Sequence, residues 1–342
     1  MTVKIGINGF GRIGRQVCKA IHQHHRGNLA MAAINDLMPA GTNAHMLKYD
    51  STYGRYPGEV EARDGDIYID GDRILSCAES DPADLPWREL GVDIVLECTG
   101  LFRDRESAAK HLAAGAGKVI ISAPGKGVDA TFVLGVNEED YDPDAHHVIS
   151  NASCTTNCVA PVAKVLHEAF GIERALMSTI HAVTNGQKIL DMAAKDLRRA
   201  RTAGSNIIPT TTGAARAVGL VLPELNGRIN GMAFRVPVVT GSVVDLTVSL
   251  REQVTVEEVN TAFKEAASGR GWLGRILDYT EDPVVSTDFI GYPASSTVDG
   301  LATDVMDGDM VPGAGGEAFP GARLCTDRHL HRPQDQESEG TA

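Results

Sequence analysis

The sequence lacks features that would point to several classes of protein. It has no apolar run long enough to cross a bilayer, which takes about 20 mostly apolar residues. It has no excess of positive charge, since its formal net charge is −13, and this balance argues against attraction to nucleic acid or to an anionic membrane. It also has no C-x-x-C pair and no dense cysteine framework. We therefore expect neither a membrane nor a nucleic-acid partner, and we assign no metal site.

The six cysteines are scattered, at positions 18, 77, 98, 154, 158 and 325. The first residues begin an apolar–polar alternation at once, without the charged and apolar regions of a secretory signal. Both features predict free thiols in a reducing cytoplasm. A length of 342 residues with 43% hydrophobic content suits a globular chain of two domains.

A glycine-rich motif opens the chain. Residues 3–8 alternate as a short strand would, residues 9–14 read Gly-Phe-Gly-Arg-Ile-Gly, and apolar residues then recur at helical spacing. In a dinucleotide-binding turn the three glycines allow a tight turn, close approach to the pyrophosphate and close packing of helix on strand. We therefore expect contacts with a cofactor from Gly9, Gly11, Arg12, Ile13 and Gly14.

An acidic residue follows at the distance this motif requires. The apolar run 29–34 ends in Asn35-Asp36, and Asp36 lies about 20 residues past the last glycine, where a carboxylate would bind the ribose hydroxyls of NAD. The same carboxylate would repel the 2′-phosphate of NADP. The alternative is an aspartate that only caps a loop. The strand, the glycines, the helix and the acid follow one another at the spacing that the motif requires, so we favour NAD as the cofactor.

The alternation of strands and helices continues. Residues 92–97 and 118–122 indicate buried strands, with a helix expected over 104–116 between them. This order predicts a parallel, doubly wound sheet. Ligands of such sheets bind beyond the carboxyl ends of the strands, so we expect further cofactor contacts from Thr99, Gly100 and Ser122.

The most informative stretch is residues 153–158, Ser-Cys-Thr-Thr-Asn-Cys, which leads into an amphipathic pattern. This order predicts that Cys154 stands at or near a helix N-terminus, where free N–H groups and the helix dipole meet. Such a site favours a thiolate and can hold an oxyanion or a phosphate. The alternative is a buried structural cysteine, a common fate of free cysteines.

Seven segments carry a resemblance to a known family: GINGFGRIGR, NASCTTNC, STIHAVTN, DLRRAR, IIPTTTGAA, LPELNG and MAFRVP. From residue 1 to about residue 311 the chain resembles phosphorylating glyceraldehyde-3-phosphate dehydrogenase. The resemblance implies an α/β fold, with a Rossmann-type NAD-binding domain in residues 1–150 and an α+β catalytic domain with a mixed or antiparallel sheet in residues 151–311. Residues 185–207 resemble the family's S-shaped loop, which lies against a neighbouring subunit's cofactor in a homotetramer.

The resemblance also implies the chemistry. Cys154 would be the nucleophile that adds to the aldehyde of D-glyceraldehyde 3-phosphate, and His181 its base partner. NAD would take the hydride, and inorganic phosphate would release the thioester as 1,3-bisphosphoglycerate. A lone histidine is more often a satisfied core residue, so the neighbouring cysteine segment carries this assignment. Two anion sites are implied: Thr184 and Arg235 for the substrate phosphate, and Ser153, Thr155, Arg198, Thr212 and Gly213 for the attacking phosphate.

The chain departs from the family in three places. Gly186 stands where bacterial members often carry aspartate, and residues 191–194 stand where strictly NAD-using members usually show Leu-Pro. The second departure bears on the choice between NAD and NADP. After Val311 the chain turns into a Pro-, His-, Asp- and Gln-rich tail without the family's nicotinamide-contacting asparagine. Its low hydrophobicity predicts disorder over residues 312–342.

Other functions stay open at this point. Erythrose-4-phosphate dehydrogenase has the same chemistry on a longer sugar phosphate. A semialdehyde dehydrogenase of similar architecture would usually prefer NADP, which Asp36 disfavours. The alternative from another class is an NAD-binding relative whose catalysis is impaired by the altered C-terminus.

Overall fold

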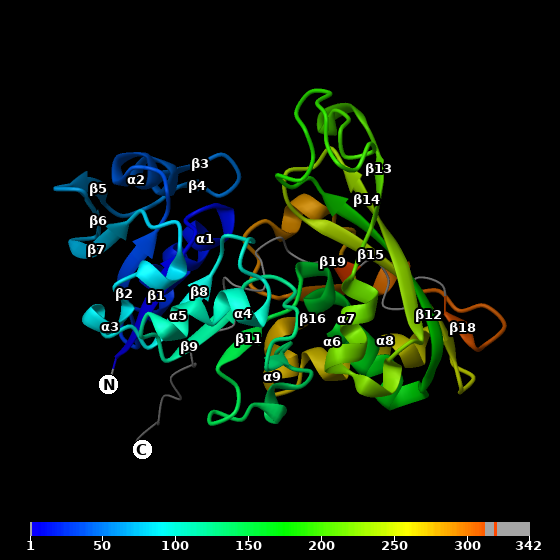
Figure 1. Ribbon diagram of the computed structural model, residues 1–342. Coiled ribbons are helices and arrows are strands. Elements are labelled where there is room, and N and C mark those ends of the chain that lie inside the picture. The colour runs from blue at the N-terminus through cyan, green and yellow to red at the C-terminus, as the bar shows by residue number, and fades with distance from the viewer. Residues whose placement is uncertain (1, 312–317, 320–342) are drawn as a thin grey trace, which may run out of the picture.

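The computed structural model describes residues 2–311 and 318–319, which form two sheets with helices packed around them (Figure 1). The N-terminal sheet and its helices, blue to cyan, lie beside the C-terminal sheet and its helices, green to orange. The tail predicted to be disordered, residues 312–342, lies outside the described residues except for Ala318–Phe319. No helix in the described part of the chain is long and apolar enough to cross a membrane.

The N-terminal sheet has nine strands in the order β10-β11-β9-β8-β1-β2-β7-β6-β5. Neighbours from β10 to β7 pair in parallel, and only the β7-β6-β5 edge is antiparallel. This confirms the predicted parallel, Rossmann-type sheet. Its strands are β1 (Val3–Asn8), β2 (Leu29–Asn35), β5 (Val60–Arg63), β6 (Asp66–Ile69), β7 (Asp72–Cys77), β8 (Ile94–Glu97), β9 (Lys118–Ile121), β10 (Ala130–Thr131) and β11 (Val148–Ser150); β3 (Tyr49–Asp50) and β4 (Gly54–Arg55) pair separately.

Short helices connect these strands. The helix expected over 104–116 is two helices, because Ala109 between them has a ψ of −13°, closer to 3₁₀ than to α geometry. The helices of this half are α1 (Arg12–Ala20), which continues as a π-helical turn over Ile21–His25, α2 (Ala40–Lys48), α3 (Trp87–Leu90), α4 (Arg105–Ala108) and α5 (Lys110–Ala113).

The C-terminal sheet is mixed, as predicted. Its order is β13-β14-β12-β15-β19-β17-β16, with β18 also paired to β15; β12 runs parallel to β14 and antiparallel to β15. The strands are β12 (Ile172–Ala182), β13 (Ile208–Thr211), β14 (Ile229–Val236), β15 (Ser242–Leu250), β16 (Leu277–Thr280), β17 (Ser296–Asp299), β18 (Met310–Val311) and β19 (Ala318–Phe319).

One long helix organises the core of this half. Helix α6 (Cys154–Phe170) buries Val159, Val162 and Leu166 in a cluster shared with β12 and β15. Strand β15 alternates buried and less buried residues, so one of its faces packs on this cluster. The packing fixes the N-terminal end of α6 relative to the sheet. The other helices of this half are α7 (Ala214–Val221), α8 (Val256–Ala267) and α9 (Trp272–Ile276).

Candidate active site

Cys154 is the first residue of α6, as the sequence predicts. The side chain of Ser153 caps this helix, because its Oγ accepts a hydrogen bond from Thr156 N at 3.1 Å. The residue before the cap, Ala152, has a φ of +62°, a left-handed conformation that is strained for a residue with a Cβ. The backbone therefore turns sharply where it presents the thiol.

The imidazole of His181 faces this thiol. Cys154 Sγ lies 3.3 Å from His181 Nε2, although 27 residues separate the two positions, because β12 carries His181 back to the start of α6. His181 Nδ1 lies 2.7 Å from the carbonyl oxygen of Ala182 and 2.7 Å from Arg235 Nη1, which itself donates to that carbonyl at 2.9 Å. Since Nδ1 faces these two groups, Nε2 is the nitrogen that meets the sulfur.

Burial and the neighbouring side chains have opposite effects on the ionisation of Cys154. Burial opposes the thiolate and is the largest single effect on its pKa, but the hydrogen bond and charge of His181 and the charge of Arg235 outweigh it. Together they lower the pKa of the Cys154 thiol to about 7. The thiolate, the nucleophilic form, is therefore well populated at neutral pH.

Cys158, one helical turn later, is the opposite case. It is fully buried, and burial raises the pKa of its thiol to about 12 despite a contact with Ser296 Oγ at 3.5 Å. Burial raises the pKa of Cys18 to about 12 in the same way. The two neighbouring thiols of α6 therefore differ by about five pKa units, roughly the difference between a reactive and an inert cysteine.

Arg235 is placed beside His181 by the parallel register of β12 and β14. Its side chain is half-buried, and its Nε is buried without a partner in the described part of the chain. A guanidinium with a buried, unpaired N–H suits an anion. Thr184, just past the end of β12, bonds the side chain of Gln187 through its N–H and its hydroxyl, at 3.0 and 3.1 Å.

The residues expected to hold the attacking phosphate lie on two helix starts and a loop. Ser153 and Thr155 stand at the beginning of α6, and Gly213 at the beginning of α7, where Thr212 Oγ1 accepts from Ala214 N at 3.1 Å. Free N–H groups at both helix starts suit a phosphate. Arg198 is exposed, and it lines a groove of about 490 Å³ together with residues of β13 and β14.

The glycine-rich turn fits a dinucleotide. A Cβ on Gly9, whose φ is +90°, would stand 2.6 Å from Thr99 N, and one on Gly14 would stand 2.1 Å from Gly9 O. Both positions therefore require glycine for close backbone contact. A Cβ on Gly11 would meet no atom within 4 Å, so the space beside the N-terminus of α1 is open at this glycine.

Asp36 stands at the carboxyl end of β2, as predicted for the ribose-binding acid. Its Oδ2 accepts from Phe10 N and its Oδ1 from Met38 N, each at 2.9 Å. The carboxylate thus caps its own loop and also ties that loop to the glycine turn. The guanidinium of Arg12, at the start of α1, pairs with Asp50 at 2.6 Å.

Thr99 and Ser122 meet through Glu97, which the sequence analysis did not single out. Thr99 N donates to Glu97 Oε1 at 2.7 Å, and the Ser122 N–H and hydroxyl donate to Glu97 O at 3.0 and 2.9 Å. Gly100 follows with a φ of +72°. The sequence did offer a signal for Glu97, because it is a carboxylate at the last position of an otherwise apolar strand.

The fold and the site together are those of a dinucleotide-dependent dehydrogenase with a thiol centre. Among the described residues, no group of three or more His, Cys, Asp and Glu side chains is placed to hold a metal ion. One sheet carries the dinucleotide loop, and the other carries a thiol whose pKa is lowered beside an imidazole.

Comparison with known proteins identifies the family. Residues 3–105 match the model of the glyceraldehyde 3-phosphate dehydrogenase NAD binding domain, and residues 153–314 match that of its C-terminal domain. The chain is 59% identical over 311 residues to glyceraldehyde-3-phosphate dehydrogenase of Geobacillus stearothermophilus, covering 91% of this chain and 92% of the relative. It is 56% identical to the enzyme of Streptomyces coelicolor, with the same coverage, and 55% identical over 306 residues to that of Pseudomonas aeruginosa, covering 89% and 90%.

The chain therefore belongs to the glyceraldehyde-3-phosphate dehydrogenase family. It is an NAD-binding enzyme of that family, which confirms the resemblance, the cofactor and the enzyme class expected from the sequence.

Proposed function

We propose that this chain oxidises D-glyceraldehyde 3-phosphate to 1,3-bisphosphoglycerate, using NAD and inorganic phosphate. The observation that carries the proposal is the 3.3 Å contact between Cys154 Sγ and His181 Nε2 at the start of α6. A nucleophile within hydrogen-bond reach of an oriented base is the general arrangement of covalent catalysis.

In the proposed reaction the Cys154 thiolate adds to the aldehyde carbon. The oxyanion formed there accepts a hydrogen bond from the N–H of Cys154 and takes up the proton that the Cys154 thiol gave to His181 Nε2, so that it becomes a hydroxyl. His181, neutral again, takes this proton back as the adduct loses a hydride and becomes a thioester. NAD held by the glycine turn would accept the hydride. Phosphate attacks the thioester carbon, the carbon–sulfur bond breaks, and Cys154 leaves as a thiolate, which its lowered pKa of about 7 favours.

The same proposal includes two binding sites, one for the phosphate group of the substrate and one for the attacking inorganic phosphate. Thr184 and Arg235 hold the substrate phosphate, supported by the unpaired Nε of Arg235. The attacking phosphate lies between the two helix starts and the loop, with Ser153, Thr155, Arg198, Thr212 and Gly213 as its partners.

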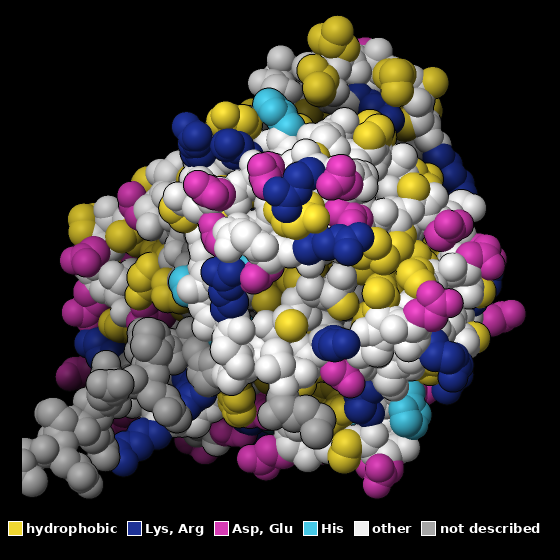
Figure 2. Space-filling view, turned by 90° about the vertical axis from the view of Figure 1, so that its left-hand side faces the viewer, with side chains coloured by type: hydrophobic (Ala, Val, Ile, Leu, Met, Phe, Trp, Pro, Cys, Tyr) yellow, Lys and Arg dark blue, Asp and Glu magenta, His cyan; other side chains and the backbone are white. Residues whose placement is uncertain are grey.

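We also propose that four copies of the chain assemble. The segment 185–207 projects from the sheet at the top of Figure 1 and carries exposed apolar side chains, among them Ile189 at 88% and Leu197 at 80% exposure. Figure 2 shows hydrophobic side chains at the tip of this projection. Exposed apolar patches mark association surfaces. The free thiols of the described residues suit the reducing cytoplasm we expect for this assembly.

The test is the reaction itself. The purified chain of 342 residues should form NADH from glyceraldehyde 3-phosphate only when inorganic phosphate is present. Erythrose 4-phosphate, assayed in parallel, should be the poorer substrate. Faster turnover of erythrose 4-phosphate would replace the proposed substrate, and binding of NAD without turnover of either aldehyde would identify a non-catalytic relative.

A further inference from the structure

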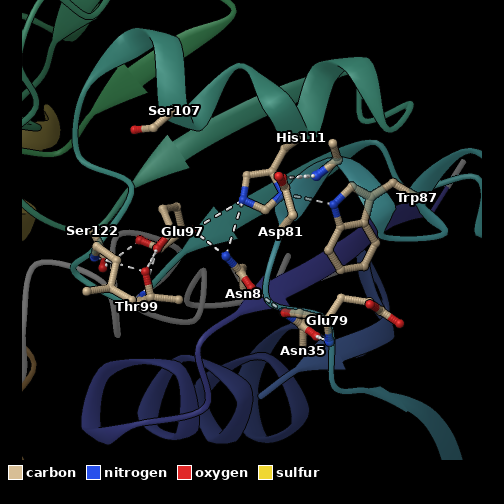
Figure 3. Close-up of polar contacts among 12 residues, drawn as sticks. Asn8, Asn35, Glu79, Asp81, Trp87, Glu97, Thr99, Ser107, His111 and Ser122 are labelled. Atoms are coloured by element: carbon tan, nitrogen blue, oxygen red, sulfur yellow. Dashed lines mark hydrogen bonds and ion pairs between the residues drawn. The ribbon is translucent and has the colours of Figure 1, made fainter. Parts of the chain in front are cut away.

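We propose that Glu97 is a positioning residue for the NAD site. Its carboxylate is 1% exposed and lies beneath the carboxyl ends of β8, β1 and β2, where the predicted cofactor contacts stand (Figure 3). The proposal rests on the placement of NAD along this edge. It adds a residue that does not touch the cofactor but fixes the main chain that does.

Four donors converge on this carboxylate. Oε2 accepts from Asn8 Nδ2 at 2.6 Å and from His111 Nε2 at 3.2 Å. Oε1 accepts from Thr99 N at 2.7 Å and from the Thr99 hydroxyl. An ionised carboxylate offers only acceptors, and every group facing it here offers a proton. The four donors therefore match a carboxylate and no other side chain of this shape.

Trp87 fixes the direction of the imidazole. Its indole nitrogen can only donate, and it donates to His111 Nδ1 at 2.9 Å. His111 therefore carries its proton on Nε2, pointing at Glu97. With both ring nitrogens engaged and the side chain 0% exposed, His111 has no second tautomer to offer.

The chain of hydrogen bonds continues to the third strand. Asn8 Oδ1 accepts from Asn35 Nδ2 at 2.7 Å. Asn35 in turn brackets the main chain of Glu79, donating to its carbonyl at 2.9 Å and accepting from its N–H at 2.8 Å. A main-chain N–H and carbonyl cannot exchange roles, so they fix the orientation of Asn35 and, through it, that of Asn8.

Three members of the network lie within two residues of a predicted cofactor contact. Asn8 precedes Gly9, Asn35 precedes Asp36, and Glu97 lies two residues before Thr99. Ser122 also belongs to this edge, since its N–H and hydroxyl both donate to the carbonyl of Glu97. The buried carboxylate thus joins the end of β1 to the loop after β8 directly, and it reaches the end of β2 through Asn8.

An amide cannot replace this carboxylate. In Glu97→Gln, an –NH₂ turned toward Thr99 would face a main-chain N–H. Turned the other way, it would face the Nε2–H of His111, which Trp87 holds in place, and the amide of Asn8, which Asn35 holds in place. Either orientation sets donor against donor in a buried site, which is costly because neither group can reach water.

The experiment compares Glu97→Gln with Glu106→Gln in the full-length protein. Glu106 lies in the first turn of α4, is exposed, and undergoes the same chemical change at the same net charge. We expect Glu97→Gln to raise the Kd of NAD, measured by calorimetry, by about tenfold. The KM for the aldehyde and kcat at saturating NAD should stay near the wild-type values. A purely structural role would lower the melting temperature and leave Kd unchanged well below it.

The possible results separate cleanly. An unchanged Kd in folded Glu97→Gln overturns the proposal, whereas failure of the wild type to bind NAD would overturn the placement of NAD itself. If Glu97→Gln does not fold, the Kd of NAD for His111→Asn provides the test instead. Its shorter side chain can still meet Trp87 but not Glu97, so one of the four donors is lost. A raised Kd with an unchanged aldehyde KM then supports the proposal, and a wild-type Kd contradicts it.

Discussion

The edge of the N-terminal sheet and the thiol centre of the C-terminal sheet satisfy their buried polar groups differently. At the edge, every side-chain nitrogen and oxygen of Asn8, Asn35, Glu97 and His111 has a partner. At the thiol centre, Arg235 Nε is buried and unpaired within the described residues. A satisfied network fixes the geometry of its members, while an unpaired buried group is available to a ligand.

The largest expected effect comes from removing the nucleophile. Cys154→Ser should lower kcat by more than about a thousandfold, because a hydroxyl is far less ionised than a thiol whose pKa is about 7. The Kd of NAD, measured by calorimetry, should stay at the wild-type value. A parallel loss of NAD binding would show that the two regions are not separate.

The next effect tests the base. His181→Asn should lower kcat by about 10²–10⁴-fold and raise the pKa of Cys154, because the hydrogen bond and charge that favour the thiolate are lost. The acid limb of the activity profile should therefore move to higher pH. The pH dependence of kcat/KM measures this shift; an unmoved limb would assign the pKa of about 7 to another group.

A smaller effect is expected at the edge of the N-terminal sheet. Asp36→Ala should narrow the preference for NAD over NADP by about tenfold, because a carboxylate repels the 2′-phosphate. The loop should also loosen, since Asp36 accepts from Phe10 N and Met38 N. The ratio of the two kcat/KM values measures the preference. If the wild-type chain already uses both cofactors equally, residues 191–194 decide the choice instead.

The smallest effect is expected at the second thiol of α6. Cys158→Ala should retain turnover and lose only about 1 kcal/mol of unfolding free energy, since it removes one buried sulfur atom. Urea unfolding followed together with kcat checks both expectations. A collapse of kcat without loss of stability would give Cys158 a chemical role that its raised pKa of about 12 argues against.

The sequence predicted local features of this protein well. The glycine turn, the strand ends at Asn8 and Asn35, and the helix that begins at Cys154 all depend on residues close together in the chain. The roles of His181 and Arg235 came only from the resemblance, and they remain predictions. The structure adds that the two residues are neighbours in the register of β12 and β14.

The sequence did not predict the network around Glu97. Its members come from β1, β2, β8 and α5, and Trp87 meets His111 across 24 positions. Buried partners at such separations follow from strand order, which hydrophobic periodicity does not encode. The side-chain pairing of Arg12 with Asp50, 38 residues apart, was missed for the same reason.

His181 and Arg235 lower the pKa of the Cys154 thiol, whereas burial raises the pKa of the Cys18, Cys77 and Cys158 thiols. Alkylation by iodoacetate, followed at each cysteine by mass spectrometry across pH, tests this difference directly. Cys154 should react first, and its rate should rise with pH through a midpoint near pH 7. One pH unit below the midpoint the rate should be about a tenth of its maximum. Cys18 and Cys158 should stay unlabelled. A midpoint near the ordinary thiol value, or equal labelling of the cysteines, would contradict the account.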